Sequence, residues 1–383
     1  MSWSADCFSD FCRDAGRDAI AREQERRLLH DELHALRALG FGAARIPEKD
    51  GGLGWSLTEV LTHQIALARA DASLGHVWRG HIAFVERLRL RGDGAERWYP
   101  RIRRGDFVGN AQSERHDTAR LATELVRHPD GTVTVSGTKF YTTGSIYADW
   151  IHLAALDGDD RVAITVTTHQ TGVSSIDDWD GFGQQLTGSG TTHFTDARVD
   201  VHDIDRDDAD AALWPLLGSV YQLSLIATIA GIAERARDDV LDFVRPRKRT
   251  FGYAGTSLPR EDPLVQLVVG EISGAAAAAK RLVLSVARDL DAAIDEGYDV
   301  ERLREVQLEV YRLQDIIPSL VLSATTKLFE VGGASAVSRS AGLDRHWRNV
   351  RTIATHNPVA QRTAAIGQYE LNGTLPEWTA PAR

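Results

Sequence analysis

Apolar residues recur with the period of an α-helix over most of the first hundred positions. Residues 14–40 repeat leucine at spacings of three and four among charged side chains, which predicts one amphipathic helix. Glycines and a proline end that pattern, because proline lacks the amide hydrogen that a helix interior needs. Ser56 or Thr58 is a candidate N-cap for a second helix that ends near residue 69, and a further helical stretch covers residues 72–91.

The period then changes to two. Residues 132–136 alternate polar and apolar side chains, as a strand with one buried face does. Similar segments follow, separated by glycine and aspartate, at residues 150–156, 161–167, 191–194 and 198–201. Residues 106–205 are therefore predicted to form a small β-unit.

Long apolar-rich stretches with the helical period return after residue 214. They cover residues 215–243, 263–296, 299–330 and 358–371. The order of elements predicts an α+β protein with three units. These are an N-terminal α-helical domain over residues 1–105, a β-domain over residues 106–205, and a C-terminal helical bundle over residues 206–383.

Composition narrows the classes of function. The formal net charge of −10 argues against a general nucleic-acid or anionic-membrane binder, since both need a basic surface. The basic run at residues 245–249 could still contact a phosphorylated cofactor. No apolar run reaches the roughly 18 residues of a membrane span, and the N-terminus lacks a signal-peptide core, so we expect a cytoplasmic protein. Cys7 and Cys12 offer neither a disulfide framework nor a metal site, and no metal is predicted.

Four short motifs occur in order along the chain. They are Ile-Pro-Glu-Lys-Asp-Gly-Gly-Leu-Gly at residues 46–54, Asn-Ala-Gln-Ser-Glu at 110–114, Gly-Thr-Lys-Phe-Tyr-Thr-Thr-Gly at 137–144 and Arg-Asn-Val-Arg at 348–351. Together they resemble segments of the acyl-CoA dehydrogenase family, and the resemblance covers about residues 20–372. It implies an N-terminal helical domain, a middle β-barrel and a C-terminal helical bundle, assembled as a homotetramer.

Three further segments resemble one branch of that family, the flavin-dependent monooxygenases typified by dibenzothiophene monooxygenase. They are residues 178–190, 261–266 and 345–349. This resemblance implies reduced FMN, supplied by a separate flavin reductase, and a C4a-hydroperoxide formed with O2. One oxygen atom would pass to a small aromatic or sulfur- or nitrogen-containing substrate. The chain has no Gly-x-Gly-x-x-Gly fingerprint of its own for NAD(P)H, which agrees with an external reductase.

The position of the dehydrogenase base separates this chain from a true dehydrogenase. Many acyl-CoA dehydrogenases place a glutamate where this chain has Asn357, and an amide cannot remove a carbon-bound proton. Glu271 or Glu234 could replace that base from a bundle helix, although a solvated helix carboxylate is their ordinary interpretation. The alternatives are therefore an FAD-dependent acyl-CoA dehydrogenase and a degenerate member that binds without turnover.

A monooxygenase must keep its flavin hydroperoxide from water and hydrogen-bond the distal oxygen. The resemblance assigns that chemistry to four residues of suitable type, which are His356, His81, Asn110 and Thr142. His76 is a further histidine of the right type. On one helix it would point about 140° away from His81, so the two are not expected to share a metal. The ordinary interpretation of each histidine is a packed or surface residue.

The resemblance also implies a set of cofactor-binding residues. Tyr141 would lie against the flavin, Thr143 near its N5 atom, and Arg249 at the cofactor phosphate of a neighbouring subunit. Ser189 would contact the phosphate or the substrate. The full set is Tyr141, Thr143, Ser113, Arg249, Phe251, Ser189, Gly332 and Gly333. FMN is the expected cofactor and FAD its alternative.

Overall fold

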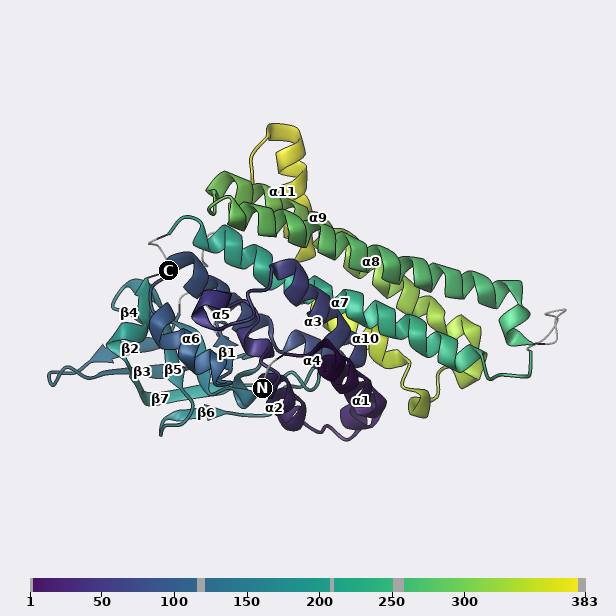
Figure 1. Cartoon of the computed structure of the whole chain (residues 1–383), viewed down its shortest axis with the longest axis horizontal. Coiled ribbons are helices and arrows are strands. Elements are labelled where there is room, and N and C mark those ends of the chain that lie inside the picture. Colours follow the sequence, from purple (N-terminus) through teal and green to yellow (C-terminus); the bar gives the residue numbers. More distant parts are fainter. Residues whose placement is uncertain (1–2, 116–120, 207–209, 251–257, 378–383) are drawn as a thin grey trace.

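A computed structural model describes residues 3–115, 121–206, 210–250 and 258–377. A sheet lies at one end of the molecule, short helices lie beside it, and long helices extend away from both (Figure 1). The described helices end at Arg103 before the first strand, strands occupy residues 108–206, and helices resume at Leu213. The division into three domains stays a prediction, with these element bounds as its structural setting.

The N-terminal helices are α1 (Ala5–Gln24), α2 (His30–Ala38), α3 (Leu57–Ala70), α4 (Ala72–His76), α5 (Arg79–Arg91) and α6 (Ala95–Arg103). The single helix predicted over residues 14–40 is wrong, because α1 and α2 are separate. Arg26 interrupts them with a left-handed φ of 52°. Its guanidinium donates to Asp177 and to the carbonyl oxygen of Trp179, so a contact with the β-unit sets the break.

Two other N-terminal expectations have opposite outcomes. Of the two N-cap candidates, Ser56 is the N-cap of α3, and it forms a reciprocal capping box with Glu59. The stretch over residues 72–91 is two helices, because α4 ends at His76 and α5 begins at Arg79. His76 and His81 therefore do not share a helix, and the angle predicted between them does not apply.

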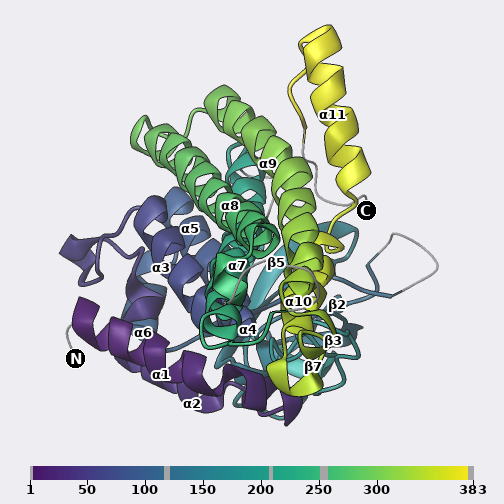
Figure 2. The same cartoon turned by 90° about the vertical axis from the view of Figure 1, so that its right-hand side faces the viewer.

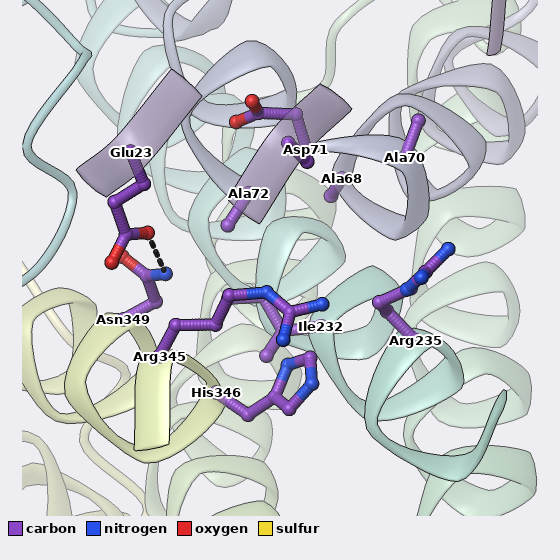
Figure 3. Close-up of a pocket in the computed structure, with 11 residues that line it drawn as sticks. Glu23, Ala68, Ala70, Asp71, Ala72, Ile232, Arg235, Arg345, His346 and Asn349 are labelled. Atoms are coloured by element: carbon purple, nitrogen blue, oxygen red, sulfur yellow. Dashed lines mark hydrogen bonds between the residues drawn. The ribbon is translucent and has the colours of Figure 1, made fainter. Parts of the chain in front are cut away.

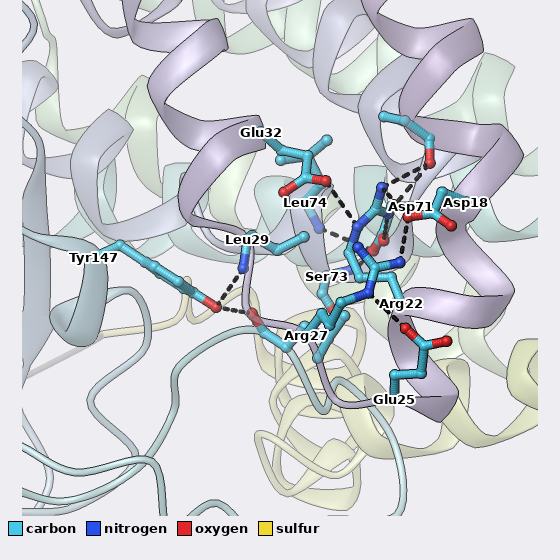
Figure 4. Close-up of polar contacts among 12 residues, drawn as sticks. Asp18, Arg22, Glu25, Arg27, Leu29, Glu32, Asp71, Ser73, Leu74 and Tyr147 are labelled. Carbon is cyan, nitrogen blue, oxygen red and sulfur yellow. Dashed lines mark hydrogen bonds and ion pairs between the residues drawn. The ribbon is translucent and has the colours of Figure 1, made fainter.

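Arg22 joins three of these helices (Figure 4). Its side chain is 2% exposed and lies 2.8 Å from the carboxylates of both Asp71, the N-cap of α4, and Glu32 in α2. It also donates to the carbonyl oxygen of Ala15 in α1. Buried charges need partners, so removing this cation would leave Asp71 buried without a counter-ion.

The β-unit is one mixed sheet. Its strands are β1 (Val108–Ala111), β2 (Glu124–Arg127), β3 (Val133–Lys139), β4 (Trp150–Asp157), β5 (Asp160–Thr167), β6 (Val173–Ser175), β7 (Thr192–Val199) and β8 (Ile204–Arg206). Their order is β6-β7-β3-β2-β4-β5-β8, with β1 parallel to β4. The end strands β6 and β8 do not pair with each other in the described residues, so the predicted barrel is an open sheet in its hydrogen bonding. The two strands predicted near residues 191–201 are the single strand β7.

The C-terminal helices are α7 (Leu213–Val244), α8 (Pro263–Asp295), α9 (Val300–Lys327), α10 (Asp344–Ala354) and α11 (Val359–Asn372). Four match the predicted stretches within a few residues, and α10 was not predicted. By length and composition α7 could span a membrane, but 94% of its apolar window is buried inside the protein, so it is a core helix. Helix α11 contacts α9, projects beyond the other helices (Figure 2) and has no buried residue.

Changing Arg22 to Met should lower the free energy of unfolding by about 3–5 kcal/mol, because Asp71 loses its buried counter-ion. Urea unfolding followed by circular dichroism measures the loss. Arg13→Met is the matched control, since Arg13 lies on α1 with a 55% exposed side chain in surface ion pairs. It should cost less than about 1 kcal/mol. Equal losses in the two variants would contradict the role of Arg22.

Candidate active site

Buried polar side chains from all three parts of the fold meet near the N-terminal half of α7. His76 closes α4, Arg79 opens α5, and Tyr221 lies on α7. The segment 181–190 reaches this place from the β-unit, and His356 follows α10. The segment is held in part by Tyr147, whose hydroxyl accepts from the Leu29 amide and donates to the Leu186 carbonyl (Figure 4).

Gln184 fixes the proton on His76. The backbone N–H of Gln184 donates to Asn349 Oδ1 at 2.6 Å, so that atom of Asn349 must be the oxygen. The Gln184 side chain then also donates to Asn349 Oδ1, at 3.2 Å, and turns its own Oε1 to His76 Nδ1 at 2.9 Å. A carbonyl oxygen only accepts, so His76 carries its hydrogen on Nδ1. Gln184 holds this position with a left-handed φ of 54°.

The other ring nitrogen of His76 has no partner. Nε2 is buried and makes no hydrogen bond with any described residue. Burial, and then the nearby Arg79 cation, lower the pKa of His76 to about 4, so the ring is neutral near pH 7. His76 therefore presents a buried lone pair, and a buried polar atom of this kind calls for a ligand or an ordered water.

A chain of hydroxyls starts from the same glutamine. Thr187 donates to the Gln184 carbonyl oxygen at 2.8 Å, and its oxygen lies 2.8 Å from Ser189 Oγ, which lies 2.8 Å from Thr143 Oγ1. Each hydroxyl has one hydrogen, and Thr187 uses its own on the Gln184 carbonyl oxygen. Ser189 must therefore donate to Thr187, and Thr143 must donate to Ser189. Thr143 thus keeps its lone pairs for a ligand, and the structure brings Thr143 and Ser189 together.

Asn349 is held by a second buried cluster (Figure 3). Its side-chain nitrogen donates to Glu23 at 3.3 Å, beside a cavity of about 20 Å³ that Arg345 and His346 also line. That volume suits roughly one water molecule. Arg345 and His346 both bond Asp239 of α7, and although burial acts to raise the pKa of that carboxyl, the hydrogen bond from His346 and the nearby arginine charges hold it well below its usual range. Helix α10 is therefore tied to α7 at the level of Asn349.

Arg79 of α5 connects Tyr221 of α7 to His356. It donates from Nε to the Tyr221 carbonyl oxygen at 3.2 Å, and its guanidinium lies 4.6 Å from the centroid of the Tyr221 ring. It also donates from Nη1 to His356 Nε2 at 3.1 Å, since an arginine cannot accept. Burial lowers the pKa of Arg79 to about 10, which leaves it a cation at neutral pH.

His356 is neutral in this arrangement. The hydrogen bond from Arg79 requires a lone pair on His356 Nε2, and desolvation, with added repulsion from Arg79, holds the pKa of this exposed residue well below the ordinary value. Asn357 donates to Gln222 Oε1 at 2.7 Å, an atom that also accepts from Gln314 at 2.8 Å. The amide at the position of the dehydrogenase base therefore anchors the loop to α7 and α9.

The two alternative bases are engaged elsewhere. Glu234 pairs with Lys280 at 3.1 Å, and Glu271 pairs with Lys327 at 2.7 Å. Glu271 is exposed, as the ordinary interpretation requires, whereas Glu234 is buried. Within the described residues, no carboxylate makes an ion pair with Arg79 at the site.

Two predicted catalytic residues have their polar atoms bonded within the protein. His81 donates from Nε2 to the Gly42 carbonyl oxygen at 2.9 Å and accepts from the Val108 amide at 3.1 Å. With both ring nitrogens occupied by backbone, His81 has none left for a ligand. Thr142 donates to the Gly190 carbonyl oxygen at 2.9 Å inside the β-unit. The site we infer contains neither residue.

Asn110 does lie at the site. Its backbone N–H donates to the Thr143 carbonyl oxygen at 3.3 Å, and its side-chain oxygen accepts from the Tyr221 hydroxyl at 3.5 Å. Gly80 approaches so closely that an added Cβ would lie 2.6 Å from the Asn110 Cβ. The predicted Asn110 therefore joins Thr143 to the wall that carries Arg79.

The predicted cofactor residues fall into two groups. Tyr141 is half exposed, has a left-handed φ of 59°, and receives hydrogen bonds from Arg115, while the exposed Ser113 bridges to Phe140 through its backbone. Both lie in the β-unit, where Tyr141 is on the same chain segment as Thr143 and Ser113 pairs with the residue before Tyr141. The second group is Arg249, Gly332 and Gly333, beyond the far end of α7, and Phe251 lies outside the described residues.

The distance between these groups follows from the helix. The 23 residues from Tyr221 to Val244 of α7 span about 35 Å at the rise of an α-helix. Gly332 lies at that far end, where an added Cβ would meet the Phe243 ring at 2.2 Å. One chain therefore does not bring Arg249 and Gly332 to the place where Thr143 lies.

Sequence reasoning missed three parts of the site. Gln184 and Asn349 lie in two of the motif segments quoted above, but their pairing across 165 residues has no local signal. Arg79 is one basic residue among many. Tyr221 and Gln222 interrupt an otherwise apolar stretch of helix, and that interruption is the one sequence signal that could have found them.

The tautomer of His76 can be tested directly. In ¹⁵N-histidine-labelled protein, we expect the His76 ring to be neutral, protonated on Nδ1, and to gain a second proton only near pH 4. Gln184→Met should remove the acceptor and give a mixture of tautomers. Gln185→Met is the control, because that side chain contacts only the Phe182 carbonyl oxygen, at 3.5 Å. A wild-type ring protonated on Nε2 would contradict the arrangement.

Comparison with known proteins supplies the family. Residues 5–106 match the N-terminal domain of acyl-CoA dehydrogenases, and residues 223–361 match their C-terminal domain. The probable FMNH2-dependent monooxygenase SfnC of Pseudomonas putida is 29% identical over 371 residues, covering 94% of this chain and 92% of that protein. Dibenzothiophene monooxygenase of Rhodococcus qingshengii is 28% identical over 378 residues, covering 94% and 90%.

A solved structure agrees. FMN-bound TdsC from Paenibacillus sp. A11-2 superposes with a TM-score of 0.89 at 28% identity, over 98% of each chain. The predicted family and fold class are confirmed, with an open mixed sheet in the middle. This chain belongs to the acyl-CoA dehydrogenase family, among its members similar to flavin-dependent monooxygenases.

Proposed function

We propose that this chain is a two-component flavin-dependent monooxygenase that takes reduced FMN from a separate flavin reductase. It would transfer one atom of O2 to a small aromatic or sulfur- or nitrogen-containing substrate. The relatives confirm the predicted enzyme class and the FMN cofactor. The observation that carries the proposal is the site itself, where neutral hydrogen-bonding groups stand in place of a carboxylate base and Asn357 is bonded to Gln222.

The residues present fit a flavin. The buried Nε2 of His76 has no partner, and Thr143 keeps its lone pairs, so two acceptors await a ligand that donates. Tyr141, which has a left-handed backbone and is half exposed, lies two residues before Thr143, and the Arg115 guanidinium lies over its ring at 4.8 Å. Reduced FMN would be the group that reacts with O2. Tyr141, Thr143, Ser189 and Asn110 are the residues that would hold its ring.

The protein's own contribution would be to orient and to exclude water. Desolvation already keeps His76 and His356 neutral, so neither would release a proton prematurely to a ligand. His356, with its Nε2 bonded to Arg79, would orient the substrate or a reactive oxygen rather than remove a carbon-bound proton. Gln184 would keep the pattern of donors and acceptors constant through turnover.

The second cofactor group supports an assembly. Arg249, Gly332 and Gly333 lie about 35 Å along α7 from the ring site, so they would contact the cofactor of a neighbouring subunit. Phe251 follows Arg249 in sequence and would act with it. Helix α11, which projects with no buried residue, offers a surface for such an assembly. We propose a homotetramer with FMN between subunits, in the cytoplasm.

The reaction can be tested with the purified chain, FMN, NADH and an added flavin reductase. We expect oxygen uptake, and incorporation of one labelled oxygen atom from O2 into dibenzothiophene or another member of a panel of sulfur and nitrogen heterocycles. Without the reductase, NADH should not be oxidised. Anaerobic bleaching of bound oxidised flavin by any acyl-CoA would contradict the proposal and favour a dehydrogenase, and failure to bind any flavin would favour a degenerate member.

The adjacent residues Thr143 and Thr142 allow a contact with the flavin ring to be distinguished from a structural role. Thr143→Val should weaken binding of reduced FMN on the order of tenfold, because one hydrogen bond worth about 1 kcal/mol is lost. Thr142→Val should leave binding within about twofold, since the Thr142 hydroxyl donates to Gly190 inside the β-unit. Anaerobic titration measures both. The reverse order of effects would place the ring against Thr142.

A further inference from the structure

Among the described residues, Arg79 is a buried cation that has no anionic partner. Its side chain is 7% exposed, and its hydrogen bonds go to the Tyr221 carbonyl oxygen and to neutral His356. No carboxylate pairs with it anywhere in the described parts of the chain. Two other buried arginines, Arg22 and Arg345, each have a buried carboxylate partner. Arg79 is the exception to this pattern.

Such a cation is costly. A buried charge loses its hydration, and natural proteins offset that loss with an opposite charge or with several hydrogen bonds to charged acceptors. Here the ring of Tyr221, at 4.6 Å, is the compensating group, and a cation–π contact offsets only part of the loss. The Nη2 group of Arg79 has no hydrogen bond with a described residue. Its N–H donors are therefore left for a ligand.

We propose that Arg79 is a substrate-binding residue whose guanidinium recognises the anionic group of a small organic acid, a sulfinate or a carboxylate. This rests on the proposed function, because it assigns the substrate class of that same site. A guanidinium fork suits the two oxygens of either group. His76 Nε2 and His356 flank the position, so the oxidisable end of the substrate would lie beside the neutral histidines.

The reduced flavin is the other possible source of negative charge. Arg79 is separated from Thr143, the residue proposed at the flavin ring, by Asn110 and by Tyr221. In the described contacts Arg79 is therefore linked to Thr143 only through these two residues and not directly. The geometry therefore favours the substrate, and the two sources are distinguished by measuring their binding separately.

The test uses the full chain without cofactor and needs no turnover. Benzenesulfinate and benzoate should raise the midpoint of thermal unfolding saturably at constant ionic strength, and neutral benzamide should not. Arg79→Gln should weaken anion binding by about 10–100-fold, which corresponds to a hydrogen bond to a charged group. Arg79→Lys should restore part of it. Arg17→Gln, which removes an equal charge from the surface of α1, should have no effect.

Two further readouts guard against a merely structural role. Arg79→Gln should unfold at the same or a higher temperature than the wild type without ligand, since an uncompensated charge has been removed. It should bind reduced FMN within about threefold of the wild type, whereas a flavin-directed cation would lose on the order of tenfold. Equal binding of benzoate and benzamide by the wild type, or a loss of FMN affinity without any anion preference, would overturn the assignment. Neither result would bear on oxygen uptake with reduced FMN, which tests the proposed function separately.

Discussion

Helix α7 is surrounded by protein along nearly its whole length, and the other parts of the fold are placed against it. Helices α3, α5, α8, α9 and α10 pack on it. At Gly231 the approach of α3 is so close that an added Cβ would lie 2.4 Å from the Ile65 carbonyl oxygen. Its buried polar groups are paired across these contacts, as when Gln64 donates to Ser224 Oγ at 2.6 Å. Without such partners, each buried polar group would cost several kcal/mol.

The site depends on α7 at two levels. Near the N-terminal end, Tyr221 and Gln222 contact Arg79 and Asn357 directly. Further along, Asp239 holds Arg345 and His346 and thereby fixes α10, which carries Asn349. Asn349 positions Gln184, and Gln184 sets the proton of His76. The hydrogen bonds at the site thus depend on Asp239 through α10 and Asn349, and they end at Gln184, which lies outside the helices and strands.

Periodicity predicted the long C-terminal helices within a few residues, because a helix buried between other helices must be apolar over many turns. It failed where a tertiary contact breaks a helix, at Arg26, whose partner Asp177 is 151 residues away. The motifs named Thr143 and Ser189, which the structure brings together, and Tyr141 two residues before Thr143, and their contacts with a cofactor stay predictions. They could not distinguish His81 from His76, because the choice is made by which ring nitrogen the backbone occupies, and no local pattern encodes that.

The same burial that creates the site has a cost in acid. The pKa values of His76, His81 and His346 all lie near 4 in the folded chain, in each case chiefly through desolvation, against about 6.5 when a histidine is unfolded. Between these values the unfolded chain binds protons that the folded chain does not. Each histidine therefore stabilises the fold fully only above about pH 6.5, and its contribution is lost as the pH falls toward 4. The neutral acceptors and the uncompensated cation of the site lower the free energy of unfolding. Such a loss is expected where polar groups are buried without partners so that they can bind a ligand.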